Sequence, residues 1–270
     1  MSPKYIILIL IFIFYSYYIK MSKNSFIKIM CLGDSITLGH RMPGSYRKFL
    51  YHNLITKGYK IKMVGAINQK KEKYYSKEDK SEFFEYEDNH CGFSAYSICA
   101  YRKRKGLLEL LQKNKCLKLN PDIIILLIGT NNAMDNYDFD ITIKDFISLI
   151  NYLVNNISKE AIIFVSTIPD MNPNIYKTWF GVYQTDNYSE DEAKNKVNDY
   201  IMKFNKEMTG IIEDYRNKNY NIRIGDLNPV IKDIDNLLFD GVHPNNKGYK
   251  IIGDFWADII DKYLTEHFKK

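Results

Sequence analysis

The stretch Ile27-Lys-Ile-Met-Cys-Leu-Gly-Asp-Ser-Ile-Thr37 decides the fold of this chain of 270 residues. It opens with a short run rich in Ile and Leu, which is typical of a parallel strand covered by helices on both faces. Gly33 follows and allows a tight bend. Because ligands bind at the carboxyl ends of the strands in an open parallel sheet, we expect Ser35 at the functional edge. A serine before a helix is more often an N-cap, so Ser35 alone does not indicate catalysis.

Similar apolar runs recur along the chain and alternate with helical patterns. The predicted strands are Ile27–Leu32, Tyr59–Val64, Asp122–Ile128, Ala161–Ile168 and Ile222–Ile224. The predicted helices are Ser45–Thr56, Lys103–Cys116, Ile141–Asn156, Asp191–Asn219 and about 247–268. Strands and helices that alternate in this way predict one doubly wound α/β domain, with three layers and a five-stranded parallel sheet.

A second polar motif, Asp240-Gly-Val-His-Pro244, follows the last predicted strand and lies at the same edge of the sheet. A serine nucleophile needs a base to take its proton, and the base needs a carboxylate that fixes its tautomer. His243 and Asp240 can supply both groups from one turn. The other histidines lack an aspartate at this spacing; they are His40, His52, His90 and His267. We therefore predict Ser35, His243 and Asp240 as the catalytic residues.

Ester hydrolysis also needs hydrogen-bond donors for the developing oxyanion. Asn131, in Gly129-Thr-Asn131, ends the third predicted strand and carries a side-chain amide. Gly92, in His90-Cys-Gly92, lies at another strand end, where a glycine lets its N–H approach a substrate closely. Together with the N–H of Ser35, these groups form the predicted oxyanion hole. Taken singly, Asn131 also fits a turn and Gly92 a simple bend.

Ser35, Gly92, Asn131 and His243 resemble the four marker residues of the SGNH (GDSL) hydrolases, over about residues 28–268. The chain is most similar to carbohydrate esterase family three, whose known members are acetyl xylan esterases. The matching stretches are Ile29–Thr37, Pro43–Arg47, Asn120–Ile123, Ile128–Asn131 and Asp240–Pro244. This resemblance implies a flavodoxin-like α/β/α fold, a Ser-His-Asp mechanism that requires no cofactor, and oxygen esters as substrates. The chain departs from the family at three positions. It has Ala95 and Tyr96 where the family favours Gly and Trp, and Asn132 where the family favours Asp.

The resemblance and the residues near the predicted catalytic positions favour a short acyl group on a sugar. These residues are polar or aromatic rather than aliphatic: Thr37, His40, Arg41, Tyr46, Tyr96, Asn132 and the loop 176–183. We expect acetylated plant polysaccharide, such as acetylated xylan, as the substrate. Alternatives are a lipid esterase or lysophospholipase, an inactive glycan-binding module, and a metal-dependent hydrolase that uses Asp135, Asp138 and Asp140. The last set lacks the glycine of a calcium loop and a histidine companion, which favours a solvated loop.

The first 20 residues stand apart from the predicted domain, which spans residues 27–270. Tyr5 to Ile19 is a mostly apolar run of 15 residues between Lys4 and Lys20. A membrane-spanning helix needs about 20 apolar residues, so this run fits a signal peptide better, and we expect a secreted protein. No small-x-small cleavage pair follows, which leaves a membrane anchor over residues 5–19, or a cytosolic start at Met21, as alternatives.

Composition restricts the remaining classes of function. The formal net charge of +6 is mixed along the chain, so nucleic acid is not an expected partner. The sharpest basic cluster, residues 102–105, reads as a solvated helix start. Of the four cysteines, Cys31 reads as a core residue, whereas Cys91 and Cys99 could form a bridge in an exported protein. Two long loops interrupt the pattern: the charged insertion 68–89, expected to be mobile, and the aromatic loop 170–190, which either walls the substrate cleft or packs structurally.

Overall fold

The computed structural model describes residues 26–68, 86–113, 116–176, 180–183 and 188–268. The predicted signal segment and most of the charged insertion lie outside these residues. Within the described part, no helix combines the length and the apolar character that crossing a membrane would require.

The centre of the molecule is a seven-stranded sheet with the order β3-β4-β1-β5-β6-β7, in which β2 also pairs with β1. Its strands are β1 (Ile27–Gly33), β2 (Ile61–Met63), β3 (Ile67–Asn68), β4 (Asn89–Gly92), β5 (Ile123–Leu127), β6 (Ile162–Ser166) and β7 (Ile222–Gly225). β2, β1, β5, β6 and β7 are mutually parallel and are the five predicted strands. The predicted fold class is therefore confirmed, with β3 and β4 as additions.

The two additional strands occupy the part of β1 that β2 leaves free. β2 pairs with residues 27–29 of β1, whereas β4 pairs with Leu32 and Gly33. β3 then pairs antiparallel with β4. This arrangement pairs Gly92 with Gly33, and Gly33 lies two residues before Ser35 in the sequence.

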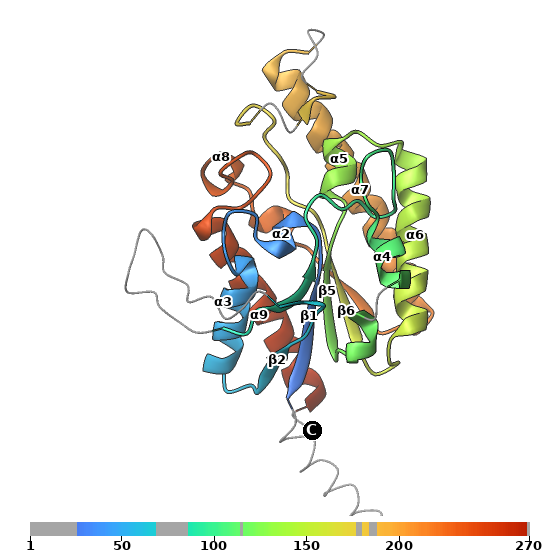
Figure 1. The fold of residues 1–270 in the computed structure, drawn as a ribbon, viewed down its shortest axis with the longest axis vertical. Coiled ribbons are helices and arrows are strands. Elements are labelled where there is room, and N and C mark those ends of the chain that lie inside the picture. Colours follow the sequence, from blue (N-terminus) through green and yellow to red (C-terminus); the bar gives the residue numbers. More distant parts are fainter. Residues whose placement is uncertain (1–25, 69–85, 114–115, 177–179, 184–187, 269–270) are drawn as a thin grey trace, which may run out of the picture.

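Helices cover both faces of the sheet (Figure 1). α3 (Ser45–Thr56) and α9 (Asn246–Phe268) cover one face, and α4 (Leu107–Lys113), α6 (Phe139–Asn156) and α7 (Glu190–Asn217) cover the other. Every residue of β5 and β6 is buried, because each strand packs against helices on both sides. Short helices occupy the carboxyl edge: α2 (Ser35–Leu38), α5 (Thr130–Met134) and α8 (Ile234–Leu237).

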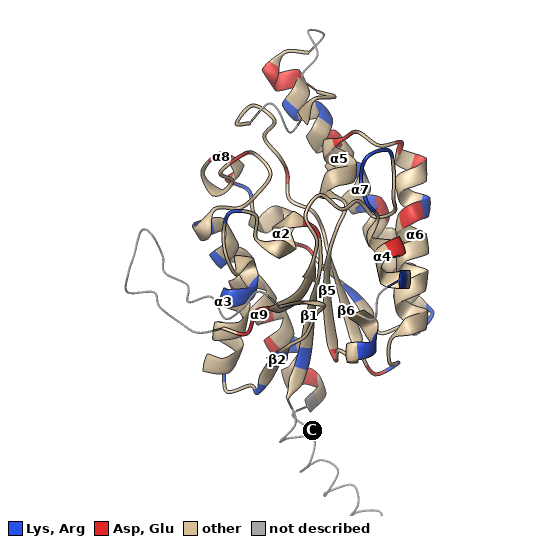
Figure 2. Ribbon diagram, in the orientation of Figure 1, with Lys and Arg blue, Asp and Glu red and all other residues tan. Residues whose placement is uncertain are grey.

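Charged residues are spread over the outer helices in the view of Figure 2. The basic cluster 102–105 is not a helix start, because α4 begins only at Leu107. Residues 101–104 instead form a turn, in which Arg104 makes two hydrogen bonds to the carboxylate of Asp135, at 2.6 and 2.7 Å. Asp138 caps α6 through the N–H of Ile141. Asp135 and Asp138 thus have protein partners, in contrast to the solvated loop that the sequence predicted.

The cysteines are also arranged differently from the prediction. All four are buried, and none of them forms a disulfide bond in the structure. The Sγ atom of Cys91 lies 2.9 Å from that of Cys116, the first residue of the short 3-10 helix η1 (Cys116–Leu119). The Sγ atom of Cys99 lies 3.9 Å from the carbonyl oxygen of Asp145. Cys31 is in the core, as predicted.

Candidate active site

Ser35 is the first residue of α2, directly after β1. Asp34, not Ser35, is the N-cap: its Oδ1 accepts a hydrogen bond of 2.9 Å from the N–H of Ile36. The hydroxyl of Ser35 is therefore not used as a cap. Gly33 is needed for close approach and not for a left-handed bend, because a Cβ there would lie 2.1 Å from the carbonyl oxygen of Leu127.

The structure brings together the three residues that the sequence predicted as catalytic. The Nε2 atom of His243 lies 2.8 Å from the Oγ of Ser35, 208 residues away in the sequence. Its Nδ1 atom lies 2.8 Å from the Oδ2 of Asp240. Residues 238–244 form a closed turn, in which the N–H of Phe239 donates to the carbonyl of His243. A base positioned between a hydroxyl and a carboxylate is the arrangement that activates a serine nucleophile.

The second carboxylate oxygen of Asp240 is also bonded. Its Oδ1 accepts hydrogen bonds from the backbone N–H groups of Val242 and His243, at 3.1 and 2.8 Å. Burial raises the pKa of Asp240, but hydrogen bonds from the His243 side chain and backbone outweigh it and lower the pKa below its ordinary value. Asp240 therefore stays ionised and holds the His243 ring in a fixed orientation.

A buried arginine holds the end of α2 that lies away from Ser35. Arg47, on α3, donates through Nε to the carbonyl of Thr37 at 2.9 Å and through Nη2 to that of Leu38 at 3.1 Å. Its Nη1 pairs with Asp88, and both side chains are almost fully buried. Asp88 belongs to the insertion that the sequence predicted to be mobile. Asp88 instead contacts α3 through this ion pair, and the same Arg47 holds α2.

Asn131 lies in the first turn of α5, after Gly129, and is buried. Its Nδ2 donates to the carbonyl of Tyr96 at 2.8 Å. An amide nitrogen carries two hydrogens, so this bond leaves one for a further acceptor. α5 is in turn held by Arg104, through Asp135 at its C-cap, and by the hydroxyl of Tyr183, which donates to the carbonyl of Ala133 at 2.8 Å.

Gly92 does not take the role that the sequence predicted. Its N–H donates to the Nδ1 of His90 at 3.0 Å. Burial lowers the pKa of His90 to about 2, so its ring is neutral and Nδ1 can accept. A Cβ on Gly92 would lie 2.5 Å from the backbone nitrogen of Leu38, so the glycine allows β4 to approach α2. Its requirement is steric.

Ala95 is the residue in this segment that the sequence analysis missed. It is exposed, its φ is 62°, and it precedes Tyr96, whose carbonyl accepts from Asn131. Its own N–H has no partner among the described residues. A left-handed conformation favours glycine, which is the residue that the family resemblance leads one to expect here. That departure was the available indication that the special backbone position is 95 and not 92.

The comparisons with known proteins agree with this geometry. The sequence profile of the GDSL-like Lipase/Acylhydrolase family matches residues 29–256. The chain belongs to this family. It is 34% identical over 245 residues to a multidomain esterase of Ruminococcus flavefaciens, a match that covers 88% of this chain and 29% of that protein. The chain thus spans less than a third of its relative.

Solved structures share the GDSL fold. A family 3 carbohydrate esterase of Clostridium thermocellum has a TM-score of 0.60 and 23% identity, with 88% of this chain and 97% of that chain covered. A family 3 carbohydrate esterase of Talaromyces cellulolyticus has a TM-score of 0.61 and 20% identity, with 89% and 99% covered. At these identities the likeness establishes the fold.

In this GDSL-family chain, His40 lies beside the turn of residues 238–244, which carries Asp240 and His243 and is called the catalytic turn below. Its ring centroid is 4.6 Å from that of His243. Burial lowers the pKa of His40, with a contribution from His243. Within the described residues, His40, Asp240 and His243 are the group that could hold a metal ion, with one ligand atom of each within 4.8 Å of the others. A cation held there would occupy the base that Ser35 contacts.

The residues expected around the substrate differ in how far they are buried. Thr37, Tyr46 and Asn132 are completely buried and do not line an open cleft. Ile175 and Tyr176 are exposed, at 38% and 46%, and belong to the segment that contacts the catalytic turn. A Cβ on Gly241 would lie 3.5 Å from that of Ile175, and the N–H of Asn172 donates to the Gly241 carbonyl at 2.9 Å.

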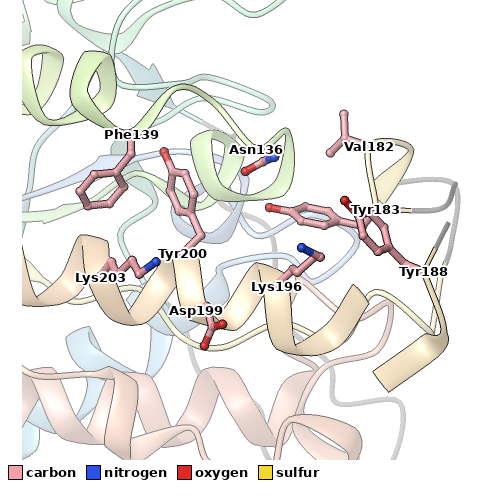
Figure 3. Close-up of a pocket in the computed structure, with 9 residues that line it drawn as sticks. All are labelled: Asn136, Phe139, Val182, Tyr183, Tyr188, Lys196, Asp199, Tyr200 and Lys203. Atoms are coloured by element: carbon pink, nitrogen blue, oxygen red, sulfur yellow. The ribbon is translucent and has the colours of Figure 1, made fainter. Parts of the chain in front are cut away.

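Residues 180–183 of the aromatic loop lie against α5, where the hydroxyl of Tyr183 donates to the carbonyl of Ala133. Phe180 is completely buried, and Tyr183 lines a cavity of about 410 Å³ between the α5–α6 turn and α7 (Figure 3). Lys196, on α7, lies over the ring of Tyr188 at 4.7 Å. Neither Ser35 nor His243 lines this cavity. Structural packing is thus confirmed for Phe180 and Tyr183, whereas a role of the loop as a wall of the substrate cleft stays a prediction. Trp179 lies outside the described residues.

Proposed function

We propose that this protein is a serine esterase that removes acetyl groups from plant cell-wall polysaccharide such as acetylated xylan. The observation that carries the catalytic part is the hydrogen-bonded series Ser35–His243–Asp240, with 2.8 Å at each contact. Family membership supports acyl transfer as the reaction.

In the proposed mechanism the Oγ of Ser35 attacks the ester carbonyl while the Nε2 of His243 takes its proton. The ionised Asp240 stabilises the imidazolium that forms. The N–H of Ser35 and the Nδ2 of Asn131 donate to the oxyanion, and the N–H of Ala95 replaces that of Gly92 as the third donor. The intermediate then breaks its bond to the sugar oxygen, which takes the proton from His243 and departs as a hydroxyl, and an acetyl group remains on Ser35. A water molecule, deprotonated by His243, releases acetate and restores the serine.

Two observations support a sugar ester over a lipid ester. The structural relatives named above are carbohydrate esterases, and the motifs around Ser35 and His243 resemble the same family. Tyr176 is exposed and follows Ile175, which lies near Gly241, and an exposed aromatic ring suits the apolar face and polar rim of a sugar. A polymeric plant substrate also agrees with the predicted export of the protein.

The catalytic proposal is tested by replacing the nucleophile. Ser35→Ala should leave only the roughly 10³–10⁴-fold rate enhancement over water that binding and oxyanion donors supply. His243→Ala should be nearly as severe, and Asp240→Asn less so. Ser148→Ala, on an exposed turn of α6, is the matched control and should hydrolyse p-nitrophenyl acetate at the wild-type rate. Near-normal activity of Ser35→Ala would refute the mechanism.

The substrate proposal is tested separately by acyl length. A lipase-like site gains about 0.8 kcal/mol from each buried CH₂, so its kcat/KM rises along a series of p-nitrophenyl esters. We expect the highest value for acetate, a sharp decrease from butyrate onward, and release of acetate from acetylated xylan. Activity that rises through octanoate, with none on the polysaccharide, would support a lipid esterase and leave the roles of Ser35 and His243 intact. No turnover of any ester by the wild type would favour a glycan-binding module.

A further inference from the structure

Two thiols from distant elements meet in the core. Cys91 lies on β4, one residue before Gly92, and Cys116 opens η1. Their Sγ atoms are 2.9 Å apart, whereas a disulfide bond measures about 2.05 Å. Both residues are buried, with 0% and 2% of their surface exposed. A movement of less than 1 Å would therefore bring the two sulfur atoms to bonding distance.

We infer that Cys91 and Cys116 form a disulfide bond when the protein folds in an oxidising compartment. The pairing is selective on geometric grounds. Cys31 packs in the core on the α3–α9 side of the sheet, away from the core that holds Cys91 and Cys116, and the Sγ of Cys99 lies against the carbonyl of Asp145. The inference does not depend on the proposed function, because it concerns a cross-link outside the catalytic groups.

The cross-link would be formed by exchange with a small-molecule disulfide, such as oxidised glutathione. One cysteine thiolate attacks the glutathione disulfide and releases one glutathione thiol. The second thiolate attacks the resulting mixed disulfide, forms the Cys91–Cys116 bond and releases the second glutathione thiol. Two protons and two electrons leave the protein, and the oxidant is reduced to two thiols.

Burial determines when this exchange takes place. The hydrogen bond between the two thiols and their burial raise the pKa of Cys91 far above its ordinary value, so the folded protein holds almost no thiolate there. Because the thiolate is the reactive form, the bond should form while the chain folds and not afterwards. Once enclosed, the disulfide should resist reductants that do not unfold the protein.

The bond would affect the segment beside the proposed active site. The segment between Cys91 and Cys116 contains Ala95 and Tyr96, and the carbonyl of Tyr96 accepts from the amide of Asn131. The same segment contains Arg104, which pairs with Asp135. A link between β4 and η1 would fix the start of this segment on the sheet. It would also reduce the conformational freedom of the unfolded chain.

Peptide mapping of the full chain tests the pairing directly. The protein is refolded in a glutathione redox buffer, alkylated with iodoacetamide under denaturing conditions and digested without reductant. We expect one cross-linked peptide pair that contains Cys91 and Cys116, with Cys31 and Cys99 alkylated. Alkylation of all four cysteines, or a link between Cys91 and any other cysteine, would overturn the inference.

Thermal unfolding gives a second readout. Wild type refolded with dithiothreitol should have a Tm about 5–10 °C below that of the protein refolded with glutathione. Cys116→Ser should lose this difference, whereas Cys99→Ser, the matched control, should keep it. If Cys116→Ser does not fold, the wild-type comparison and the peptide map still decide. Equal Tm values for the two wild-type preparations, with no cross-linked peptide, would contradict the inference.

Discussion

Arg47 and Asp88, 41 residues apart in the sequence, form an ion pair in which the two side chains are 0% and 1% exposed. The same guanidinium donates to the last carbonyls of α2, whose first residue is Ser35. The position of Ser35, the proposed nucleophile, thus depends on a charge whose ion-pair partner in the described part of the chain is Asp88.

Asp88→Asn should destabilise the fold strongly, because it leaves the charge of Arg47 buried without a counter-ion. Breaking one partner of a buried pair costs about 3–5 kcal/mol. The matched control is Glu213→Gln, whose pair with Arg216 is 45–58% exposed and should contribute no more than about 0.5 kcal/mol. Urea unfolding measures both. Equal losses from the two variants would show that the Arg47 pair is not energetically buried.

Asn131→Ala should lower kcat about 10²–10³-fold and change KM little, if the amide acts on the developing oxyanion. The variant also leaves the carbonyl of Tyr96 without its donor, so a modest loss of stability should accompany it. Asn155→Ala, on the exposed face of α6, is the control for amide loss. Steady-state kinetics on p-nitrophenyl acetate separate the two effects. An increase in KM alone would assign Asn131 to ground-state binding.

Gly92→Ala and Ala95→Gly should have opposite effects on stability. A Cβ at position 92 would lie 2.5 Å from the nitrogen of Leu38 and 2.7 Å from the carbonyl carbon of Thr37, so α2 must shift. We expect a loss of about 1–3 kcal/mol and reduced kcat. Glycine at position 95 relieves a left-handed φ of 62° and should raise stability by up to about 1 kcal/mol. Thermal unfolding and kinetics check both, and a neutral Gly92→Ala variant would mean that β4 and α2 are not closely packed.

The carboxyl of Asp34 should make stability depend on pH. Burial raises its pKa from 3.8 to about 6, against the opposing hydrogen bond from the N–H of Ile36. Since the folded state binds this proton more tightly, the contribution of Asp34 is largest below pH 4 and is lost as the pH rises through about 4–6. Asp34→Asn keeps a capping oxygen and removes the charge. It should unfold like wild type at pH 4 and be up to about 3 kcal/mol more stable at pH 8. A difference that does not vary with pH would contradict the shift.

The layered fold and the residues around which the site is built can be predicted from the amino-acid sequence alone. Strands such as Ile123–Leu127 are apolar on both faces because helices cover both, and this local pattern can be read without coordinates. The same pattern puts Ser35 and His243 at one edge, because parallel strands end on the same side of a sheet. These conclusions require only the types of the residues and their order along the chain.

The contacts of the segment that contains β4, by contrast, depend on long-range packing that local sequence patterns do not specify. β4 and β3 are four and two residues long and carry no periodic pattern, so their pairing depends on the free part of β1. That pairing turns the Gly92 N–H toward His90 and brings Cys91 to Cys116. Hydrogen bonds and sulfur contacts act over about 3 Å, whereas local sequence patterns specify burial but not the partner across the core.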